Sequence, residues 1–206
     1  MKLFHYVCVM TSILAASTQA DFLLPIEDAF AISGRGVSVT GKVERGSVKM
    51  GDEVEIVGYR SFRSVCADVE NFNKVQGQVT ATAGDQVGVL LRGIKREDVE
   101  RGQVMATPGS IKAYQSFEAS VHLFDQEDGG ATIVKNSSIR LQIRTASLSG
   151  RVQPTGDADK IKPGETTHAK IILVNPVALE EGQEVLVLNR NGKKIGTATV
   201  SMPLDS

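Results

Sequence analysis

The sequence predicts an all-β protein: two tandem antiparallel β-barrels that follow a short apolar N-terminal leader. Three observations lead to this fold class. After residue 21, no stretch shows the apolar periodicity of an amphipathic helix of ten or more residues. Short apolar or alternating segments take its place, separated by frequent glycine-containing turns. Strands of this length and spacing are typical of barrels and sandwiches.

The individual strands follow from their patterns. Residues 139–144 alternate strictly, with one apolar and one charged face. Residues 37–43 and 195–200 alternate more loosely, and the continuous apolar runs 54–57, 171–174 and 185–188 predict buried strands. Asn191-Gly192 predicts a hairpin between Leu188 and Ile195, because a type I′ turn needs a positive φ at both of its central positions.

A Pro-Gly breaker at residues 107–110 divides the chain into a first barrel at 21–109 and a second at 110–206. Residues 1–20 are mostly apolar, with Lys2 near their start and small residues ahead of Asp21. They are either a signal peptide or a non-native leader. A cleaved signal predicts a secreted or periplasmic protein without a membrane span in the mature chain, and an uncleaved chain predicts a cytoplasmic one.

Composition narrows the function classes. The net charge is −1, so no overall field attracts nucleic acid, and any such contact must be local. The sequence has no Trp, and its only cysteines are Cys8, in the leader, and Cys66. This number excludes a disulfide framework and a zinc site. We expect Cys66 to be a small buried residue in a strand.

Nucleotide binding and catalysis are both disfavoured. Gly36 to Lys42 approaches a phosphate-binding loop, but Val43 follows where Ser or Thr is needed, and the segment has the pattern of a strand. Asn73-Lys74-Val75-Gln76 fails the base-reading motif of GTPases at its last position. The histidines are far apart in the sequence, and we expect no cofactor, no metal and no enzymatic activity.

Two charged groups remain open to interpretation. Glu27 and Asp28 are neighbours that would point to opposite faces of a strand, which suits a solvated edge or the binding of an amine or amide better than an acid–base pair. Arg92, Lys95, Arg96 and Arg101 lie among acidic residues around one turn. They form either a surface salt-bridge network or domain contact, or a phosphate-contact patch.

Residues 24–46, 84–97 and 100–106 resemble the second domain of bacterial elongation factor Tu. Shorter motifs, among them Lys162-Pro163-Gly164 and Asn175-Pro176-Val177-Ala178, are similar to the third domain of that family. The resemblance implies two β-barrels packed on each other. The GTPase domain of the family would precede residue 22, where this sequence has only about twenty mostly apolar residues.

In that family the second domain holds the aminoacyl group and terminal adenosine of charged tRNA. The resemblance implies that Glu27, Asp28, Phe30 and Thr40 line an aminoacyl pocket. It also implies that Ile32, Gly34 and Glu70 lie near the adenosine, and that Gln86 takes the place of the pocket Asn of the family. Ser38 stands where the family has Val, and Asn73 where it has Arg. The run 131–138 replaces an aromatic and basic segment that faces tRNA.

The function that follows is an elongation factor Tu-like binding module, related to aminoacyl-tRNA delivery in translation elongation and without a GTPase domain of its own. Its implied partners are aminoacyl-tRNA, the ribosome, or a GTPase domain supplied in trans. The alternative is a secreted or surface binding protein built on the same barrels and no longer active in translation. The apolar leader favours this alternative.

Overall fold

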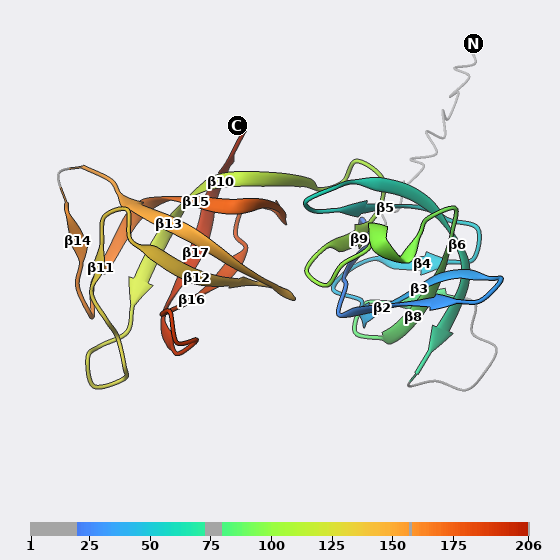
Figure 1. The fold of residues 1–206 in the computed structure, drawn as a ribbon, viewed down its shortest axis with the longest axis horizontal. Helices are drawn as coiled ribbons and strands as arrows, with labels where there is room; N and C mark the ends of the chain where they lie inside the picture. Colours follow the sequence, from blue (N-terminus) through green and yellow to red (C-terminus); the bar gives the residue numbers. More distant parts are fainter. Residues whose placement is uncertain (1–19, 73–79, 157, 206) are drawn as a thin grey trace, which may run out of the picture.

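The computed structural model describes residues 20–72, 80–156 and 158–205. The strands gather into two bodies that lie side by side along the longest axis of the molecule (Figure 1). The leader at residues 1–19 and the motif at residues 73–76 lie outside the described part of the chain. As the sequence predicts, the fold is nearly all β, and its one described helical segment is the 3-10 turn η1 at Arg96–Asp98.

The first body is a curved seven-stranded antiparallel sheet with the order β1-β9-β5-β6-β8-β3-β2, accompanied by the small pair β4-β7. Its strands are β1 (Leu23–Pro25), β2 (Asp28–Ile32), β3 (Gly36–Lys42), β4 (Ser47–Lys49), β5 (Glu53–Val57), β6 (Phe62–Asn71), β7 (Thr80–Thr82), β8 (Gln86–Arg92) and β9 (Val104–Ala106).

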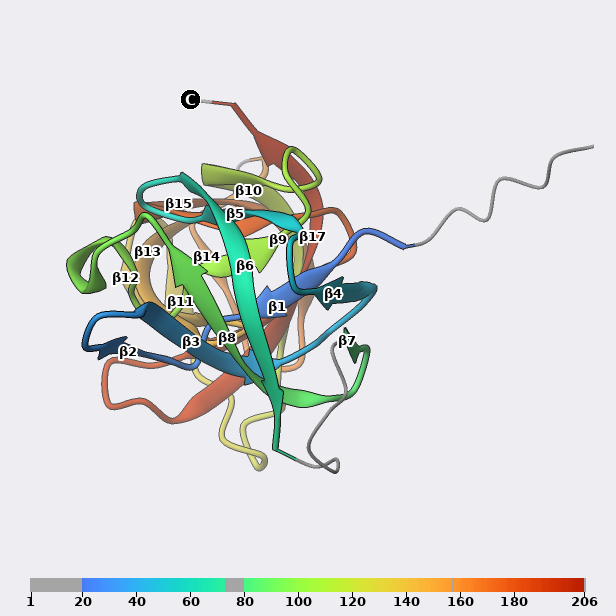
Figure 2. The ribbon, with the colours of Figure 1, turned by 90° about the vertical axis from the view of Figure 1, so that its right-hand side faces the viewer.

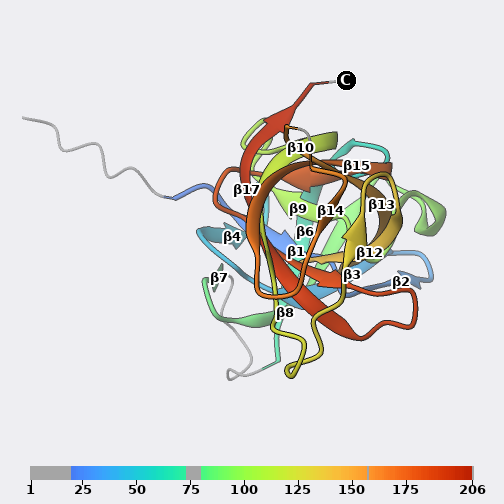
Figure 3. The same cartoon turned by 90° about the vertical axis from the view of Figure 1, so that its left-hand side faces the viewer.

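The second body is a closed barrel with the order β10-β15-β13-β12-β16-β17, plus the pair β11-β14, as the end-on view shows (Figure 3). Its strands are β10 (Lys112–Leu123), β11 (Ile133–Val134), β12 (Ser138–Ile143), β13 (Ala146–Pro154), β14 (Lys160–Ile161), β15 (Thr166–Leu179), β16 (Glu184–Leu188) and β17 (Lys194–Leu204).

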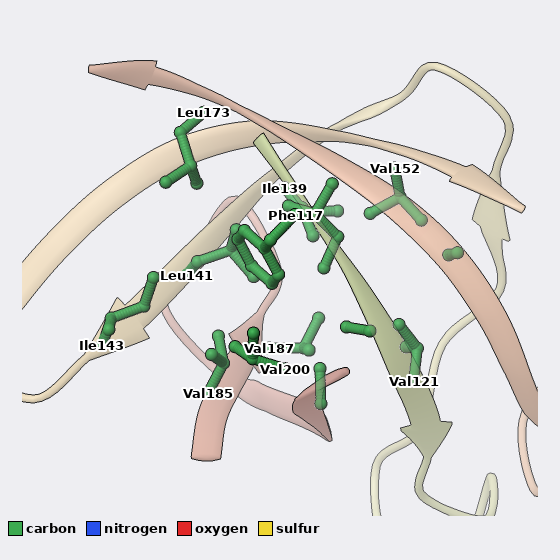
Figure 4. Close-up of a cluster of buried hydrophobic side chains, with 14 of the residues drawn as sticks. Phe117, Val121, Ile139, Leu141, Ile143, Val152, Leu173, Val185, Val187 and Val200 are labelled. Carbon is green, nitrogen blue, oxygen red and sulfur yellow. The ribbon is translucent and has the colours of Figure 1, made fainter. Parts of the chain in front are cut away.

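Alternating side chains build each core. In β12 the residues Ile139, Leu141 and Ile143 are buried while Arg140 and Gln142 are exposed, as the strict alternation predicts. Around them, Phe117 and a ring of Val, Leu and Ile side chains fill the second barrel (Figure 4). A separate cluster of buried side chains fills the first body.

Close backbone approach draws β1 against β3 in the first body. A Cβ on Gly41 would lie 2.3 Å from the carbonyl oxygen of Pro25, so only glycine fits at this position. The main-chain N–H of Glu27 then donates to the carbonyl oxygen of Thr40 over 2.8 Å. Residue 27 is therefore fixed beside β3, at the start of the face described below.

The last hairpin differs from the expected type I′ turn. Asn191 and Gly192 do lie between β16 and β17, but the connection runs over residues 189–193 and only Gly192 has a positive φ, of 82°. The side-chain Oδ1 of Asn189 accepts hydrogen bonds from the main-chain N–H groups of Asn191 and Lys193. A longer loop closed by an Asn side chain has replaced the tight turn.

The two bodies meet in a small apolar seam. Its buried side chains come from both barrels: Leu23, Val57, Val104, Ala106, Ile111 and Ala178. Next to the seam, Gly102 of the first body lies so near the second that an added Cβ would be 2.9 Å from Cα of Ala146. The barrels therefore touch through backbone as well as side chains.

Candidate functional site

The candidate site is the outer face of four neighbouring strands, β2, β3, β8 and β6, which lie side by side in Figure 2. The strand register arranges their outward residues in two rows. One row is Asp28, Thr40, Gly88 and Glu70, and the other is Phe30, Ser38, Leu90 and Asp68. Side chains two residues apart share a face, so both rows lie on the same side of the sheet.

A shallow hollow of about 50 Å³ lies on this face. Its lining residues are Ile32, Arg35, Ser38, Asp68, Glu70, Gly88 and Leu90. Gly88 lies in the middle of the hollow's lining because it pairs with Thr40 on one side and with Glu70 on the other. The lining combines the apolar side chains of Ile32 and Leu90 with the carboxylates of Asp68 and Glu70, which suits a ligand with a flat apolar part and hydrogen-bonding edges.

Exposed apolar side chains border the hollow. Phe30 is 52% exposed, Phe72 is 51% exposed and Ile32 is 37% exposed. Large apolar residues gathered at a polar-rimmed surface are typical of a binding site. The hollow itself is too small to bury a ligand, so these side chains supply the contact surface around it.

Glu27 and Gln86 form a polar pair beside the same face. Nε2 of Gln86 donates a hydrogen bond to Oε2 of Glu27 over 2.8 Å. Asp28 is occupied differently, since its Oδ1 accepts a hydrogen bond from the main-chain N–H of Ala29 over 2.8 Å. The carboxylate of Glu27 is therefore engaged by an amide from a strand 59 residues away along the chain.

The β2–β3 hairpin forms one end of the site. Gly34 has a φ of 71° and Gly36 a φ of 130°, conformations that favour glycine. Arg35 reaches from the turn to Asp68 of β6, with 3.2 Å between Nη2 and Oδ2. This ion pair is exposed, so it contributes little to stability, and both of its residues line the hollow.

The eight residues that the resemblance implies for this site divide into three groups. Ile32 and Glu70 line the hollow, and Phe30 and Thr40 lie on the same face. Glu27 and Gln86 bind each other, and Asp28 caps its own strand. Gly34 forms the turn, and a Cβ built there would meet no atom within 4 Å, so it is not a wall of the hollow.

Sequence reasoning missed four side chains of this face: Arg35, Asp68, Phe72 and Leu90. The signal for two of them was period-two alternation. Counting in twos from Glu70 reaches Asp68 in one direction and Phe72 in the other, so all three share the outer face.

The basic residues near η1 do not converge on one point. Nη1 of Arg96 donates to the carbonyl oxygen of Val99 over 2.7 Å. Lys95 lies 3.9 Å from the carboxylate of Glu97 in an exposed pair. Arg101 instead reaches the site, because its Nη1 donates to the carbonyl oxygen of Glu27 over 3.3 Å. Of the two interpretations of this cluster, the described contacts fit a surface network.

A second charged group crosses the seam between the barrels. Arg144 of the second barrel has a φ of 50° and a side chain that is only 6% exposed. Its Nε donates to Oε2 of Glu44 in the first barrel over 2.8 Å, and its Nη2 also contacts Oε1 of Glu180. Arg45 of the first barrel donates to that same oxygen of Glu180 over 2.8 Å.

This network shifts two pKa values. Burial alone would raise the pKa of Glu180, but the hydrogen bonds and charges of Arg45 and Arg144 outweigh burial and lower it. The hydrogen bond to Glu180 raises the pKa of Arg45. Glu180 and Arg45 therefore stay ionised near neutral pH, and the seam carries fixed charges as well as apolar contacts.

The described residues show neither a metal site nor a phosphate-binding loop. They contain no group of three or more His, Cys, Asp or Glu side chains that could hold a metal ion. His122 and His168 lie on β10 and β15, and Nδ1 of His122 is 2.9 Å from Oγ1 of Thr166. The segment that approaches a phosphate-binding loop is strand β3. A search of the same residues for a helix long and apolar enough to cross a membrane finds none.

The fold defines a class of protein, a nearly all-β protein of two tandem β-barrels. Comparison with family models is more specific. Residues 36–106 match elongation factor Tu domain 2, and residues 110–202 match the elongation factor Tu C-terminal domain. No model of a GTPase domain matches the chain. The chain therefore belongs to the elongation factor Tu family, through its second and third domains.

Proposed function

We propose that this protein is a binding module related to aminoacyl-tRNA delivery in translation elongation, with residues 21–109 as the binding barrel and 110–206 as its companion. The observation that carries the proposal is the polar-rimmed hollow between Ile32, Glu70 and Gly88, with exposed Phe30 beside it. Apolar side chains next to carboxylates suit the aminoacylated 3′ end of a tRNA, which carries a flat base, a ribose and an amine. Ribosome contact, or a GTPase domain supplied in trans, belongs to the same proposal.

In this proposal each side chain of the face has a role. Glu70 at the rim of the hollow accepts hydrogen bonds from ribose hydroxyls, and Ile32 and Leu90 contact the base. Thr40 and Phe30 face the amino acid. Glu27 accepts a hydrogen bond from the amine once the Gln86 amide has moved away from it.

The test is an NMR titration of the full chain with 3′-deoxy-3′-(L-alanylamino)adenosine, a stable analogue of the aminoacylated tRNA end. We expect saturable shifts of the amides of Thr40, Glu70, Gln86 and Gly88. Glu70→Gln should weaken binding, whereas Glu118→Gln, the matched change of an exposed strand glutamate on the second barrel, should not. Shifts confined to other residues, or no saturation at millimolar ligand, would overturn the proposal.

We further propose that the chain has no GTPase activity of its own. The residues that approach a phosphate-binding loop lie in β3 and are paired on both sides with β2 and β8. Their main-chain N–H groups therefore cannot gather around a phosphate. Titration with a fluorescent GDP analogue should show no binding, and saturable micromolar binding that Lys42→Ala abolishes would contradict this expectation.

The apolar composition of residues 1–20 favours a second candidate, a secreted or surface binding protein that keeps the barrels without a role in translation. The mature N-terminus separates the two functions. A chain that starts at Asp21 and is recovered outside the cytoplasm supports the secreted function, whereas an uncleaved cytoplasmic chain supports the translation function.

A further inference from the structure

A second hollow lies on the outer surface of the second barrel. Its volume is about 400 Å³, which falls in the range typical of small-ligand sites. It lies over β12, β13 and β15, which are neighbours in the closed barrel, and it extends to β10 (Figure 1). Five polar side chains contribute to its lining, those of Gln115, Asn136, Ser138, Arg151 and Gln153. It is therefore a more polar and much larger hollow than the one on the first barrel.

The strand register places Arg151 in the middle of this lining. Arg151 of β13 pairs with Ser138 of β12 on one side and with Ile172 of β15 on the other. These three side chains face outward, because the adjacent residues Val152 and Ile171 are buried in the core. The guanidinium group therefore has a hydroxyl on one flank and an apolar side chain on the other.

Arg151 is also available to a ligand. Its side chain is exposed, and within the described part of the chain it makes neither an ion pair nor a hydrogen bond. Of the described residues that line the hollow, it is the one with a charge. The nearby Arg140 of β12 lies outside the lining, and its Nη1 is 3.6 Å from the Cβ position of Gly192. An anion that enters this hollow therefore meets one unpaired guanidinium group.

An irregularity in β15 forms the apolar side of the hollow. The register between β10 and β15 shifts between Tyr114 and Ser116. Nε2 of Gln115, at the shift, donates to the carbonyl oxygens of Leu173 and Val174 over 3.4 and 3.3 Å. The Val174 side chain is 65% exposed there. Such irregularities reorient side chains and are common next to binding sites.

The amide side chains of the hollow leave both donors and acceptors open. Nε2 of Gln153 donates to Oδ1 of Asn136 over 2.9 Å. Among the described contacts this leaves Nδ2 of Asn136 as a donor, and the Oε1 atoms of Gln153 and Gln115 as acceptors. A peptide main chain carries the complementary groups, one N–H and one C=O per residue.

We propose that this hollow binds the C-terminal end of a peptide whose last side chain is aliphatic. The fork of Arg151 holds the terminal carboxylate, and Ile172 and Val174 contact the last side chain. Asn136 and Gln153 exchange hydrogen bonds with the last amide group. The inference goes beyond the proposed function, because it concerns a different barrel and a different class of ligand.

A carboxylate fits this lining better than a phosphate does. Phosphate sites gather several cationic side chains or a concave group of main-chain N–H donors. This lining offers one guanidinium group, and its other open donors belong to neutral side chains. One positive charge matches the single negative charge of a peptide C-terminus.

The test is an NMR titration of the full chain with two probes, acetyl-Gly-Val and its C-terminal amide. We expect the acid to cause saturable shifts of the main-chain amides of Ser138, Arg151 and Gln153 and of the side-chain amide of Asn136. The amide probe should bind about tenfold more weakly, because it lacks the charge that Arg151 recognises. Equal affinities, or no saturation at millimolar acid, would overturn the proposal.

Two arginine variants separate a specific contact from general attraction. Arg151→Gln should weaken binding of the acid by about tenfold and remove its advantage over the amide. Arg140→Gln, the matched change of an exposed arginine outside the lining, should change the affinity by less than about twofold, since an exposed charge is screened. If both variants weaken the acid equally, the positive surface acts as a whole and the proposal fails.

The apolar side is tested with Val174→Ser. This variant should weaken acetyl-Gly-Val but leave acetyl-Gly-Gly unchanged, because only the valine side chain contacts residue 174. Equal effects on both peptides would contradict the assignment of the last side chain to this wall.

Competition distinguishes a peptide from an RNA backbone. Acetate should displace bound acetyl-Gly-Val at lower concentration than inorganic phosphate does. If phosphate or a short RNA duplex displaces the peptide as readily as acetate, the hollow is a phosphate site and the peptide assignment is wrong.

Discussion

Gln86 and Glu27 bind each other across the edge of the site, with 2.8 Å between Nε2 and Oε2. The hydrogen bond occupies Oε2 of the glutamate carboxylate in the free protein, so a ligand amine competes with an internal amide for that oxygen. Shortening the amide by one methylene group in Gln86→Asn should break this hydrogen bond and free the carboxylate.

We therefore expect Gln86→Asn to bind the alanylamino-adenosine probe more tightly, by about three- to tenfold, since one hydrogen bond to a charged group is worth roughly 1.5–3 kcal/mol and water replaces part of it. Isothermal titration at neutral pH measures the change. Gln153→Asn, which shortens a similar strand glutamine on the second barrel, is the control. Weaker binding by Gln86→Asn would show that the pocket is assigned wrongly.

The seam network predicts a pH-dependent stability. The pKa of Glu180 is lowered from its usual value of 4.5, so its contribution is fully present above that value and is lost as the pH falls through the folded pKa. Glu180→Gln should reduce the free energy of unfolding by about 1 kcal/mol at pH 7, allowing for solvent screening of a partly exposed group.

The difference between Glu180→Gln and the wild type should shrink as the pH falls below 4.5 and vanish below the lowered pKa of Glu180 in the folded protein, where the wild-type carboxylate is also neutral. Urea unfolding at a series of pH values measures it. Glu181→Gln changes the adjacent exposed glutamate and should leave the free energy of unfolding unchanged at every pH. A pH-independent difference would mean that Glu180 acts through shape and not through charge.

Close contact at Gly102 predicts a steric effect on the seam. Gly102 has a φ of 99°, and an added Cβ would lie 2.9 Å from both Cα and Cβ of Ala146. Gly102→Ala should therefore destabilise the protein by about 2–4 kcal/mol, combining backbone strain with overpacking.

Gly51→Ala separates the two effects, because Gly51 has a φ of 93° but open space around its Cβ position. We expect it to cost about 1 kcal/mol, from strain alone. Thermal unfolding followed by circular dichroism compares the two variants. Equal losses would exclude a steric contribution from the contact between the barrels.

Cys66 should be a protected thiol. It is fully buried, and burial raises its pKa to about 11, with the carboxylate of Asp52 acting in the same direction. In a Cys8→Ser background, alkylation by iodoacetamide at pH 8 should be slow in the native protein and fast in denaturant. Rapid labelling of the native protein would show that β6 opens readily at this position.

Local pattern was sufficient to predict much of this fold. The alternation of Ile139, Leu141 and Ile143 with Arg140 and Gln142 indicates which side chains of β12 are buried and which are exposed. The β-branched alternation from Val37 onward distinguished strand β3 from a phosphate-binding loop. In both cases the information lies within one element, because period two fixes which side chains face the core.

What the sequence could not provide depends on contacts between distant elements. The Arg144–Glu44 pair joins residues 100 positions apart, and no local pattern indicates that a turn arginine will be buried there. The Asn191-Gly192 turn was predicted too short because Oδ1 of Asn189 accepts two main-chain hydrogen bonds, which close a longer loop. Period two places Phe72 on the outer face, but the space for its ring is left by Gly88 of a different strand, and no pattern within β6 indicates that contact.

The seam between the barrels also fixes the spacing between their surfaces. Apolar side chains, a backbone contact at Gly102 and the ion pairs around Arg144 hold the two bodies at several separate points. The distance from the hollow on the first barrel to any surface on the second is therefore set by the fold before a partner arrives. A partner that touches both barrels must have its two contact points at that spacing. The protein can therefore distinguish partners by the distance between their contact points, even where neither contact alone is selective.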